Sequence, residues 1–463
     1  MRIVFAPAPT GSGHNMRSLA LARELRRQSP DAEVTVLLGS LQPTFGPLFD
    51  AAGVKVIDIA GDHVDHATRS NLTRELGWQT YIKDYAAPAF VNGERVLGYL
   101  SHYQDLAPDL VVSDYNISAS MAAAIAGVPH ALVTERYDFT LLQIDDSTLE
   151  AGGFKVDRED LRRGRNSLHA VFDWIVSTAE IVLTDKPYVP ELDAGTSVAA
   201  ALDAGRAVFT GPMIREIPER GDGEDVRASL GLGPGPVMVG SVGGTSMFWE
   251  NKQRVIESYI LAHRRLKHTH PDLQLVLLGR EWVEAPDDVV VLTYLPDWMP
   301  LLQEADVLLS APGWITVTEV AALRVPTVFV LSSLAEYHEV EASDRLGRLG
   351  FPSLIAPAVD QLADAVRPFI GARGAGPSPA HLAIAPEGSG TARAAGLLAE
   401  AARGARGDRA SRGAGARGAA ASRVGGATQI EEVPHAEPLG VDGVPPAGRP
   451  PQTTPLRVEE PVR

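Results

Sequence analysis

The sequence predicts an α/β protein made of two doubly wound, mostly parallel sheets in succession. Three observations predict this fold. Short continuous apolar runs alternate with helix-like stretches, this alternation starts again after Pro212, and a glycine-rich turn follows the first strand of each series. Continuous apolar runs are typical of parallel strands covered on both faces. Their alternation with helices predicts two Rossmann-like domains.

The first series, residues 1–212, is expected to form one domain. Its strands are Ile3–Ala6, Val34–Leu38, Val54–Ile59, Leu110–Ser113, Ala131–Thr134, Ile181–Leu183 and Val208–Thr210, and Met16–Gln28 and Ile117–Ala126 are helix-like. Residues 213–234, rich in Gly, Pro, Glu and Asp, read as a linker.

The second series, residues 235–403, is expected to form a second domain with a C-terminal helix. Its strands are Val237–Ser241, Leu273–Leu278, Val289–Leu292, Val307–Ser310 and Thr327–Leu331, and its helices are Lys252–His268, Thr316–Leu323 and Val340–Leu349. In such folds ligands bind beyond the carboxyl ends of the strands, so we expect a cleft where loops of both domains meet.

The last 60 residues, 404–463, differ from the rest. They contain 10 Gly, 8 Pro and no aromatic residue. Such a segment buries too little apolar surface to offset its ordering entropy, so the sequence predicts a disordered tail without site chemistry.

Composition excludes several classes of protein. The 463 residues are 45% hydrophobic and 22% charged, as in ordinary globular proteins. A net charge of −16 argues against a binder of nucleic-acid polymers. The chain has no cysteine, so a disulfide scaffold and thiolate chemistry are excluded. Neither a spanning helix nor a signal peptide is evident, and we expect a cytoplasmic protein.

The first glycine turn, residues 9–14, places a histidine at a helix start. Its spacing is not that of a dinucleotide fingerprint, because residue 16 is Met. The glycines alone fit a tight strand–helix turn. His14, however, follows the carboxyl end of a strand, where a side chain is well placed for proton transfer.

The second glycine turn follows the first strand of the second series. It contains Gly243, Gly244 and Thr245, whose amides and hydroxyl suit a phosphate or a sugar. The Gly-Lys-Ser/Thr sequence of a P-loop is absent, so an ATPase is not predicted.

The third constellation runs from Asp306 to Glu319 as strand, turn and helix. The turn, with Thr316, presents amides at a helix N-terminus, which suits a diphosphate. Glu319, three residues further on, could accept hydrogen bonds from a ribose diol. The same spacing also fits a capping box between Thr316 and Glu319, and both interpretations stay open.

Together these residues resemble the inverting GT-B glycosyltransferases. The third constellation is most similar to the peptidoglycan N-acetylglucosaminyltransferase and monogalactosyldiacylglycerol synthase group. In that group a Ser-x-x-Gly-x-x-Thr-x-x-Glu stretch binds the nucleotide diphosphate sugar. The resemblance implies donor-binding roles for Ser310, Gly313, Trp314, Ile315, Thr316 and Glu319, and for the sugar-loop residues Tyr337, His338 and Glu339.

Further donor contacts follow from the same resemblance. The segment 294–302 is similar to the family's base-binding stretch, and Arg215 to an arginine that approaches the diphosphate. Arg280, which follows the predicted strand Leu273–Leu278, could also reach that group, although a lone arginine is more often a surface residue.

The resemblance also implies a catalytic dyad in the first domain. His14 falls on the position of the general base, and Asp114 on the acidic partner found in natural-product glycosyltransferases. Glu135 matches an acid of the peptidoglycan branch. The alternative for Asp114 is a helix cap before Asn116.

The implied reaction moves a hexose-type sugar from a nucleotide diphosphate sugar to an acceptor hydroxyl. UDP is the favoured nucleotide and dTDP the alternative, and the acceptor is a small molecule or a lipid-linked one. No cofactor other than the sugar nucleotide and no metal are expected. No basic amphipathic helix supports membrane contact.

Two rivals stay open. A sugar-nucleotide epimerase of the same double fold needs no acceptor surface, and a non-catalytic sugar-nucleotide binder needs no base. Aromatic residues in region 60–105 resemble an acceptor site, although ordinary core packing explains them equally well. They are Trp78, Tyr81, Tyr85, Phe90, Tyr99 and Tyr103.

Overall fold

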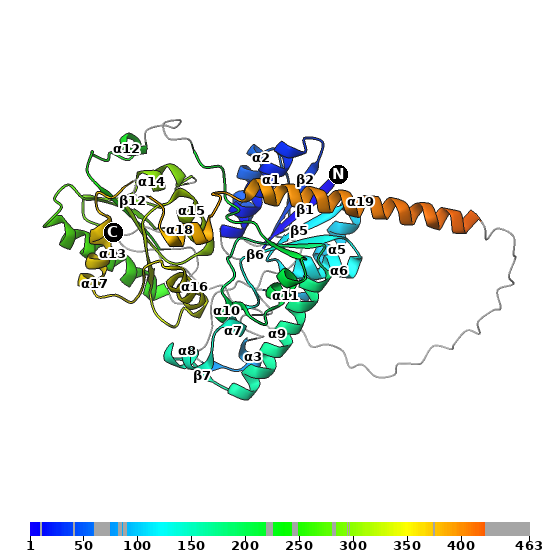
Figure 1. Cartoon of the computed structure of the whole chain (residues 1–463), viewed down its shortest axis with the longest axis horizontal. Helices are drawn as coiled ribbons and strands as arrows, with labels where there is room; N and C mark the ends of the chain where they lie inside the picture. The colour runs from blue at the N-terminus through cyan, green and yellow to red at the C-terminus, as the bar shows by residue number, and fades with distance from the viewer. Residues whose placement is uncertain are drawn as a thin grey trace, which may run out of the picture. The chain divides into compact units, whose positions relative to one another are not determined.

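The computed structural model confirms the first doubly wound sheet. All seven strands are parallel, in the order β3-β2-β1-β5-β6-β8-β9. They are β1 Arg2–Pro7, β2 Glu33–Leu38, β3 Lys55–Asp58, β5 Leu110–Asp114, β6 His130–Thr134, β8 Ile181–Thr184 and β9 Ala207–Phe209 (Figure 1). The predicted apolar runs therefore all become strands, within two residues of the expected ends.

The structure describes residues 1–9, 12–39, 42–59, 75–81, 86, 90–218, 226–242, 249–279, 284–293, 295, 297–373 and 376–421. Burial is described within these ranges except at 80, 81, 249–252 and 408–421.

The second sheet has six parallel strands in the order β12-β11-β10-β13-β14-β15. They are β10 Val237–Ser241, β11 Gln274–Leu278, β12 Val289–Leu292, β13 Val307–Ser310, β14 Thr327–Leu331 and β15 Ser353–Ile355. The edge strand β15 was not predicted, because three half-exposed residues carry too little apolar pattern.

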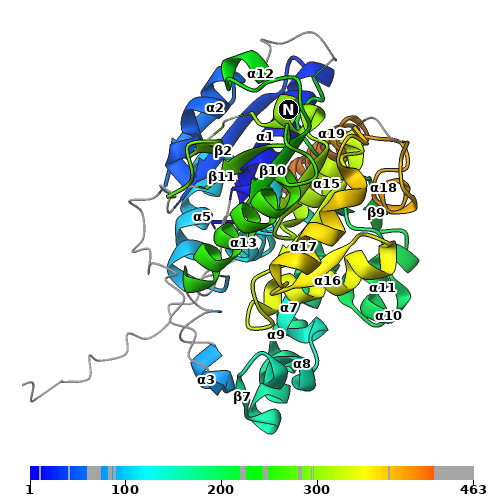
Figure 2. The same ribbon diagram turned by 90° about the vertical axis from the view of Figure 1, so that its left-hand side faces the viewer.

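Helices cover both faces of each sheet (Figure 1, Figure 2). In the first half they are α1 Gly13–Gln28, α2 Gly46–Ala51, α3 Trp78–Tyr81, α5 Gly93–Leu106, α6 Ile117–Ala126, α7 Thr140–Gln143, α8 Asp146–Ala151, α9 Arg158–Thr178, α10 Pro190–Asp193 and α11 Ser197–Asp203. In the second half they are α12 Val226–Ser229, α13 Trp249–Lys267, α14 Met299–Glu304, α15 Trp314–Leu323, α16 Tyr337–Leu349, α17 Val359–Val366 and α18 Pro379–Ile384, followed by α19 Thr391–Ala421. A two-residue pair, β4 Glu75–Leu76 with β7 Lys155–Val156, lies beside α9.

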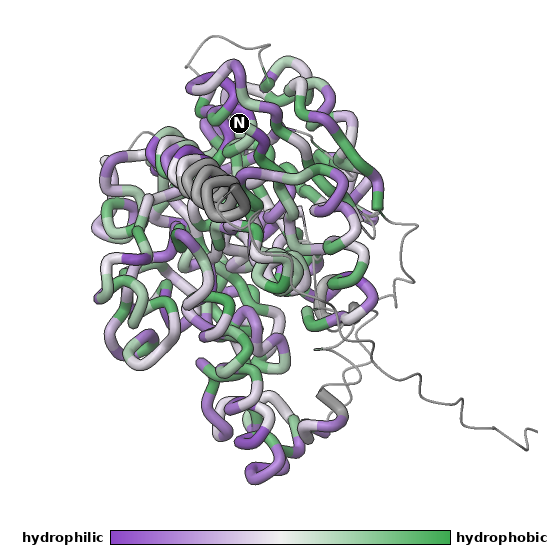
Figure 3. The backbone as a smooth tube through the Cα atoms, turned by 90° about the vertical axis from the view of Figure 1, so that its right-hand side faces the viewer, coloured by the Kyte–Doolittle hydropathy of each residue, from purple (hydrophilic) through white to green (hydrophobic). Residues whose placement is uncertain are grey.

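Alternation along the first strand divides the core into two layers. Ile3 and Phe5 pack in one cluster with α1, whereas Val4 and Ala6 pack in another with α5 and α6. Figure 3 shows hydrophobic and hydrophilic stretches interleaved along the backbone, as expected where helices bury one face.

The chain crosses from one half to the other within the predicted linker. Met213 belongs to a core cluster of the first half and Ile214 to one of the second half. The C-terminal helix was predicted as part of the second domain, 235–403, but Ala394, Leu398 and Ala402 of α19 pack in a core cluster of the first half.

The predicted tail is not irregular from its start. Helix α19 continues through Gly404 to Ala421, so its first 18 residues are helical, and residues 422–463 lie outside the described residues. The chain divides into two compact units, Met1–Ala410 and Ser411–Arg463. No helix among the described residues is long and apolar enough to span a bilayer.

Candidate active site

Three neighbouring strands of the first sheet each end in an acidic residue. Asp114 closes β5, Glu135 follows β6, and Asp185 follows β8. Because β5, β6 and β8 are paired in register, these carboxylates lie along one edge of the sheet. All three are buried, at 0%, 7% and 0% exposure.

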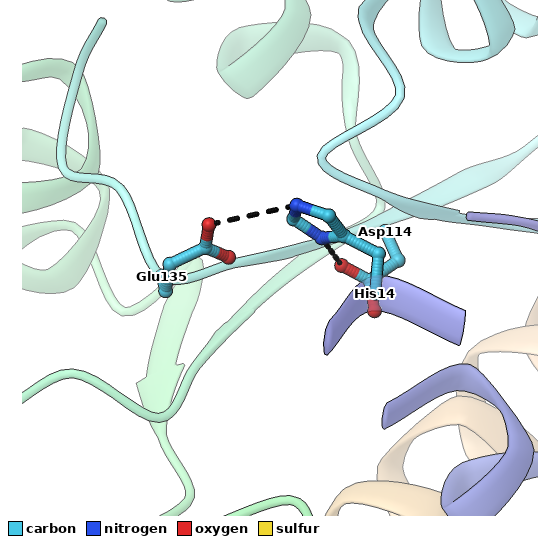
Figure 4. A group of neighbouring side chains, drawn as sticks. All are labelled: His14, Asp114 and Glu135. Carbon is cyan, nitrogen blue, oxygen red and sulfur yellow. Dashed lines mark hydrogen bonds and ion pairs between the residues drawn. The ribbon is translucent and has the colours of Figure 1, made fainter. Parts of the chain in front are cut away.

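His14 lies in the first turn of α1 and faces this edge. Its Nδ1 is 2.8 Å from Asp114 Oδ1, and its Nε2 is 3.8 Å from Glu135 Oε1, beyond hydrogen-bond length. Figure 4 shows the imidazole between the two carboxyl groups. The cap interpretation of Asp114 is wrong, because Asn116 caps α6 by accepting from the Ala119 amide.

Arg17, which sequence reasoning missed, organises the carboxylates. It lies one turn after His14 and is 2% exposed. Its guanidinium donates to Asp114 from Nε at 2.9 Å, to Glu135 from Nη2 at 2.6 Å, and to Asp185 from Nη1 at 3.2 Å. The i,i+3 spacing from His14, together with acids at three strand ends, was the available signal.

The pKa shifts in this cluster follow from burial and its shared cation. Burial raises the pKa of Asp185 to about 6, although Arg17 acts against it. Burial also acts to raise the pKa of Glu135, but the charges of His14, Arg17 and Arg136 outweigh it and hold that pKa well below its usual range. Three carboxylates around Arg17 raise its pKa despite burial.

His14, Asp114 and Glu135 offer ligand atoms within 4.8 Å of one another, a spacing that fits a metal ion. Arg17, however, already donates to both carboxylates. A divalent cation would have to displace this buried guanidinium or share the carboxylates with it, at a cost in electrostatic repulsion. The donor set therefore fits an arginine-bound acidic cluster better than a metal centre.

The turn before α15 presents a helix N-terminus. Gly313 is the N-cap residue, without a side-chain cap hydrogen bond, and it is exposed with open space around it. Thr316 lies inside the helix, so the capping box with Glu319 is wrong. Ser310 is 1% exposed, and its hydroxyl donates to the Ala311 carbonyl at 3.0 Å.

Glu319 and Arg215, each predicted to contact the donor, form an ion pair with one another. Arg215 Nη2 donates to Glu319 Oε1 at 3.0 Å, and Trp298 Nε1 donates to Oε2 at 2.8 Å. Burial raises the pKa of Glu319, although Arg215 and Trp298 counter it. The expected base-binding stretch is thus tied to the expected ribose ligand through Trp298.

The dyad and the donor turn meet at two contacts. A Cβ built on Gly13 would lie 3.2 Å from Ile315 Cγ2, so only a glycine fits there without displacing that side chain. Trp314 Nε1 donates to Asp185 Oδ1 at 3.0 Å. The first turns of α1 and α15 are therefore neighbours.

The predicted sugar-loop residues begin α16. Tyr337 is 1% exposed and its ring packs 6.0 Å from that of Phe154 in the first half. His338 and Glu339 are half-buried, with Nε2 and Oε1 4.0 Å apart. The predicted contacts Gly243, Gly244, Thr245, Arg280 and Tyr294 lie outside the described residues.

A second buried ion cluster, also missed by sequence reasoning, joins the two halves. Lys186 Nζ lies 2.7 Å from Glu341 Oε2, and Arg345 donates to both Glu341 and Asp193, at 2.9 and 2.6 Å. All four side chains are at most 1% exposed. The lysine ammonium also lies 4.7 Å from the ring centre of Trp314.

Aromatic rings line the region beside His14. Tyr115 is stacked 6.2 Å from the imidazole, at a φ of 49° that is strained for a non-glycine residue. Phe90, Phe139 and Phe172 pack around Tyr115. Of the aromatic residues considered for the acceptor, Tyr99 and Tyr103 lie in the core and Phe90 lies in this group. Trp78 packs over Gly164 of α9; for Tyr81 only the backbone is described, and Tyr85 lies outside the described residues.

Comparisons with known proteins agree with this architecture. The chain is 23% identical over 356 residues to a UDP-N-acetylglucosamine–N-acetylmuramyl-(pentapeptide) pyrophosphoryl-undecaprenol N-acetylglucosamine transferase of Caldanaerobacter subterraneus subsp. tengcongensis, which covers 75% of this chain and 83% of that protein. No protein-family model matches.

Solved structures share the fold. The kitacinnamycin glycosyltransferase has a TM-score of 0.57 at 18% identity, covering 86% of this chain and 98% of its own. The glycosyltransferase SnogD from Streptomyces nogalater has a TM-score of 0.53 at 18% identity, covering 87% and 99%. A protein described as a UDP-N-acetylglucosamine 2-epimerase from Listeria monocytogenes scores 0.55 at 11% identity, covering 86% and 94%.

These similarities establish the GT-B fold, with two Rossmann-like domains. The predicted resemblance to the peptidoglycan N-acetylglucosaminyltransferase group and to natural-product glycosyltransferases is confirmed. Together they indicate a glycosyltransferase.

Proposed function

We propose that this protein is an inverting, metal-independent glycosyltransferase that moves a hexose-type sugar from a nucleotide diphosphate sugar to an acceptor hydroxyl. The observation that carries the proposal is the His14–Asp114 pair at 2.8 Å, in which His14 lies on α1 and the start of α1 touches the start of α15. A base and a helix N-terminus suited to a diphosphate thus lie in adjacent turns.

The proposed reaction begins with the acceptor. Its hydroxyl proton passes to His14 Nε2 while the hydroxyl oxygen attacks C1 of the sugar, and the bond from C1 to the diphosphate oxygen breaks with its electron pair leaving on the diphosphate. Asp114 accepts from Nδ1–H, which fixes the tautomer and stabilises the imidazolium that forms. Attack opposite the leaving group inverts C1.

The leaving diphosphate needs positive potential. The amides at the start of α15 and the guanidinium of Arg215 would supply it. Arg215 lies 3.0 Å from Glu319, so donor binding would share this guanidinium between the carboxylate and the diphosphate. No metal is required in this scheme, because helix dipole and arginine replace it.

The donor and acceptor classes belong to the same proposal. UDP-sugars are favoured over dTDP-sugars by the likeness to an enzyme whose name includes UDP-N-acetylglucosamine. The acceptor is a small molecule or a lipid-linked one, in bacterial natural-product or cell-envelope glycoside synthesis, and the proposed location is the cytoplasm.

The test compares binding with turnover in His14→Ala. Wild-type protein is incubated with UDP- and dTDP-sugars and candidate acceptors, and the released nucleotide is measured. We expect the variant to bind UDP as the wild type does, because its donor contacts lie in the other half, and to turn over roughly 10²–10⁴ times more slowly. Unchanged turnover would remove His14 as the base.

A sugar-nucleotide epimerase is the second candidate, favoured by the fold shared with the Listeria protein. Incubation with UDP-N-acetylglucosamine alone separates the two. An epimerase interconverts the sugar without acceptor, whereas the glycosyltransferase that we propose leaves its stereochemistry at C2 unchanged.

A further inference from the structure

Asp185 contacts both the dyad's arginine and the donor helix. Its Oδ2 accepts from Arg17 at 3.2 Å and its Oδ1 accepts from Trp314 Nε1 at 3.0 Å. Arg17 in turn donates to Asp114, the partner of His14. One fully buried carboxylate therefore lies in a continuous chain of hydrogen bonds from α15 to the imidazole.

Stability alone does not account for a charged group here. A buried carboxylate is costly unless its partners compensate it, and Arg17 is already shared by Asp114 and Glu135 at shorter distances. The longest of the three contacts falls to Asp185. One guanidinium cannot by itself neutralise three carboxylates, so Arg17 leaves an excess of negative charge among them.

We propose that Asp185 is a positioning residue that couples the donor helix to the catalytic dyad. Trp314 orients its carboxylate, the carboxylate orients Arg17, and Arg17 keeps Asp114 against His14. The negative charge of Asp185 also stabilises the imidazolium formed when the acceptor loses its proton. This inference rests on the proposed glycosyl transfer.

The coupling has a physical consequence for the donor. Trp314 is the first residue of α15, so a shift of that turn on binding a nucleotide diphosphate would move the Trp314–Asp185 contact and, through it, Arg17. The charged and titratable groups that interact with this carboxylate are Arg17, Glu135, Asp114 and Tyr137. Arg17, Asp114 and Glu135 also contact the His14 imidazole, at 3.3, 2.8 and 3.8 Å.

The variants Asp185→Asn and Trp314→Phe test the coupling. Asparagine keeps the shape and an acceptor for the indole but loses the charge. We expect Asp185→Asn to bind UDP within about threefold of wild type, to lower kcat about 10- to 100-fold, and to move the acid limb of the pH–rate profile about 1 unit lower. In the double variant, the total fold-loss in kcat should be smaller than the product of the two single fold-losses, because both changes break the same chain of hydrogen bonds.

Asp193→Asn is the matched control. Asp193 is equally buried and also bonded across the two halves, to Arg345, and within the described part of the chain it makes no hydrogen bond to His14 or Asp114. It should lose thermal stability without moving the pH–rate profile. If Asp185→Asn matches Asp193→Asn in both respects, Asp185 is merely structural and the proposal is overturned.

A readout on the ligand-free protein separates this inference from the proposed function. The protonation of the His14 imidazole is followed against pH by nitrogen-15 NMR, with His14→Ala identifying its signal. Asp185→Asn should titrate at lower pH than wild type, and Asp193→Asn should not. An unmoved titration overturns the coupling. Failure of the wild type to bind UDP or dTDP would instead overturn the proposed function.

Discussion

Replacing Glu341 by Gln should expose the energetic role of the ion cluster between the two halves. Glu341 accepts from Lys186 at 2.7 Å and from Arg345 at 2.9 Å, and both contacts are fully buried. Glutamine keeps the volume but leaves Lys186 against a neutral amide. Arg345 retains its hydrogen bond to Asp193 at 2.6 Å, so the loss of a charged partner affects mainly Lys186.

The magnitude follows from the pKa of the lysine. Burial lowers the pKa of Lys186 from its usual 10.5 to about 8, even though Glu341 acts to raise it. Without Glu341 the ammonium loses its proton more readily still. Folding with a neutral Lys186 at pH 7 costs at most about 5 kcal/mol, because the lysine must lose its proton below its usual pKa of 10.5, at about 1.36 kcal/mol per pKa unit. Breaking a buried ion pair typically costs a similar amount, about 3–5 kcal/mol.

The sign of the pH dependence is fixed by linkage. In Glu341→Gln the unfolded chain binds one more proton than the folded chain between pH 7 and 9, so the stability of the variant rises with pH. The wild type also gains stability as pH passes through about 8, but less steeply at pH 7, because its folded state still holds the proton. The difference in the free energy of unfolding between the wild type and Glu341→Gln should shrink by about 1–2 kcal/mol from pH 7 to pH 9.

Urea unfolding at pH 7, 8 and 9 measures this difference. Glu75→Gln is the matched control, since its pair with Lys155, at 3.2 Å, is 69% and 81% exposed and should contribute less than about 1 kcal/mol. The double variant Lys186→Met with Glu341→Gln should recover stability and lose the pH dependence. A loss below about 1 kcal/mol at pH 7, or one independent of pH, would refute the reasoning.

Three further predictions concern the dyad, the donor site and the C-terminus. Asp114→Asn should slow turnover, by less than the roughly 10²–10⁴ expected for His14→Ala, because the imidazole remains but loses its orienting charge; equal kcat in steady-state assays would remove the dyad. Glu319→Ala should weaken UDP binding by about 1–3 kcal/mol in calorimetry on folded protein, through lost hydrogen bonds to a charged group; unchanged affinity for both UDP and dTDP would leave Glu319 only its ion pair with Arg215. A chain ending at Gly404 should keep its melting temperature and turnover, because Ala402 is the last described residue of the core cluster that α19 joins; a clear fall in either would show that the removed residues contribute to the fold or the reaction.

Local pattern was enough for most of the fold. Apolar runs such as Val237–Ser241 and Val307–Ser310 appear as strands with the predicted ends. Each such run is continuous and bounded by turn residues, so the information lies within a few neighbouring positions. The edge strand β15 and the helical start of the tail were missed, because three residues give no pattern and a high glycine content obscures a helix.

The candidate site was predictable from the sequence where its residues directly follow predicted strands. His14 and Asp114 follow predicted strands, and neighbouring parallel strands bring their carboxyl ends together, so a contact between the two could be expected before any coordinates. The structure places them 2.8 Å apart. The roles of Gly243, Gly244 and Thr245 stay predictions, since these residues lie outside the described ranges.

What the sequence determined by itself was the two-sheet fold, because periodicity and strand ends are local properties, whereas the dyad and the donor turn stay predictions. The tertiary structure alone decided the partners of buried charges. The sequence does not distinguish Arg17 from any other arginine on an amphipathic helix. Lys186 and Glu341 are 155 residues apart in the sequence. Which cation neutralises which carboxylate depends on how the two halves pack, and burial then turns an ordinary charge into a group that must be paired.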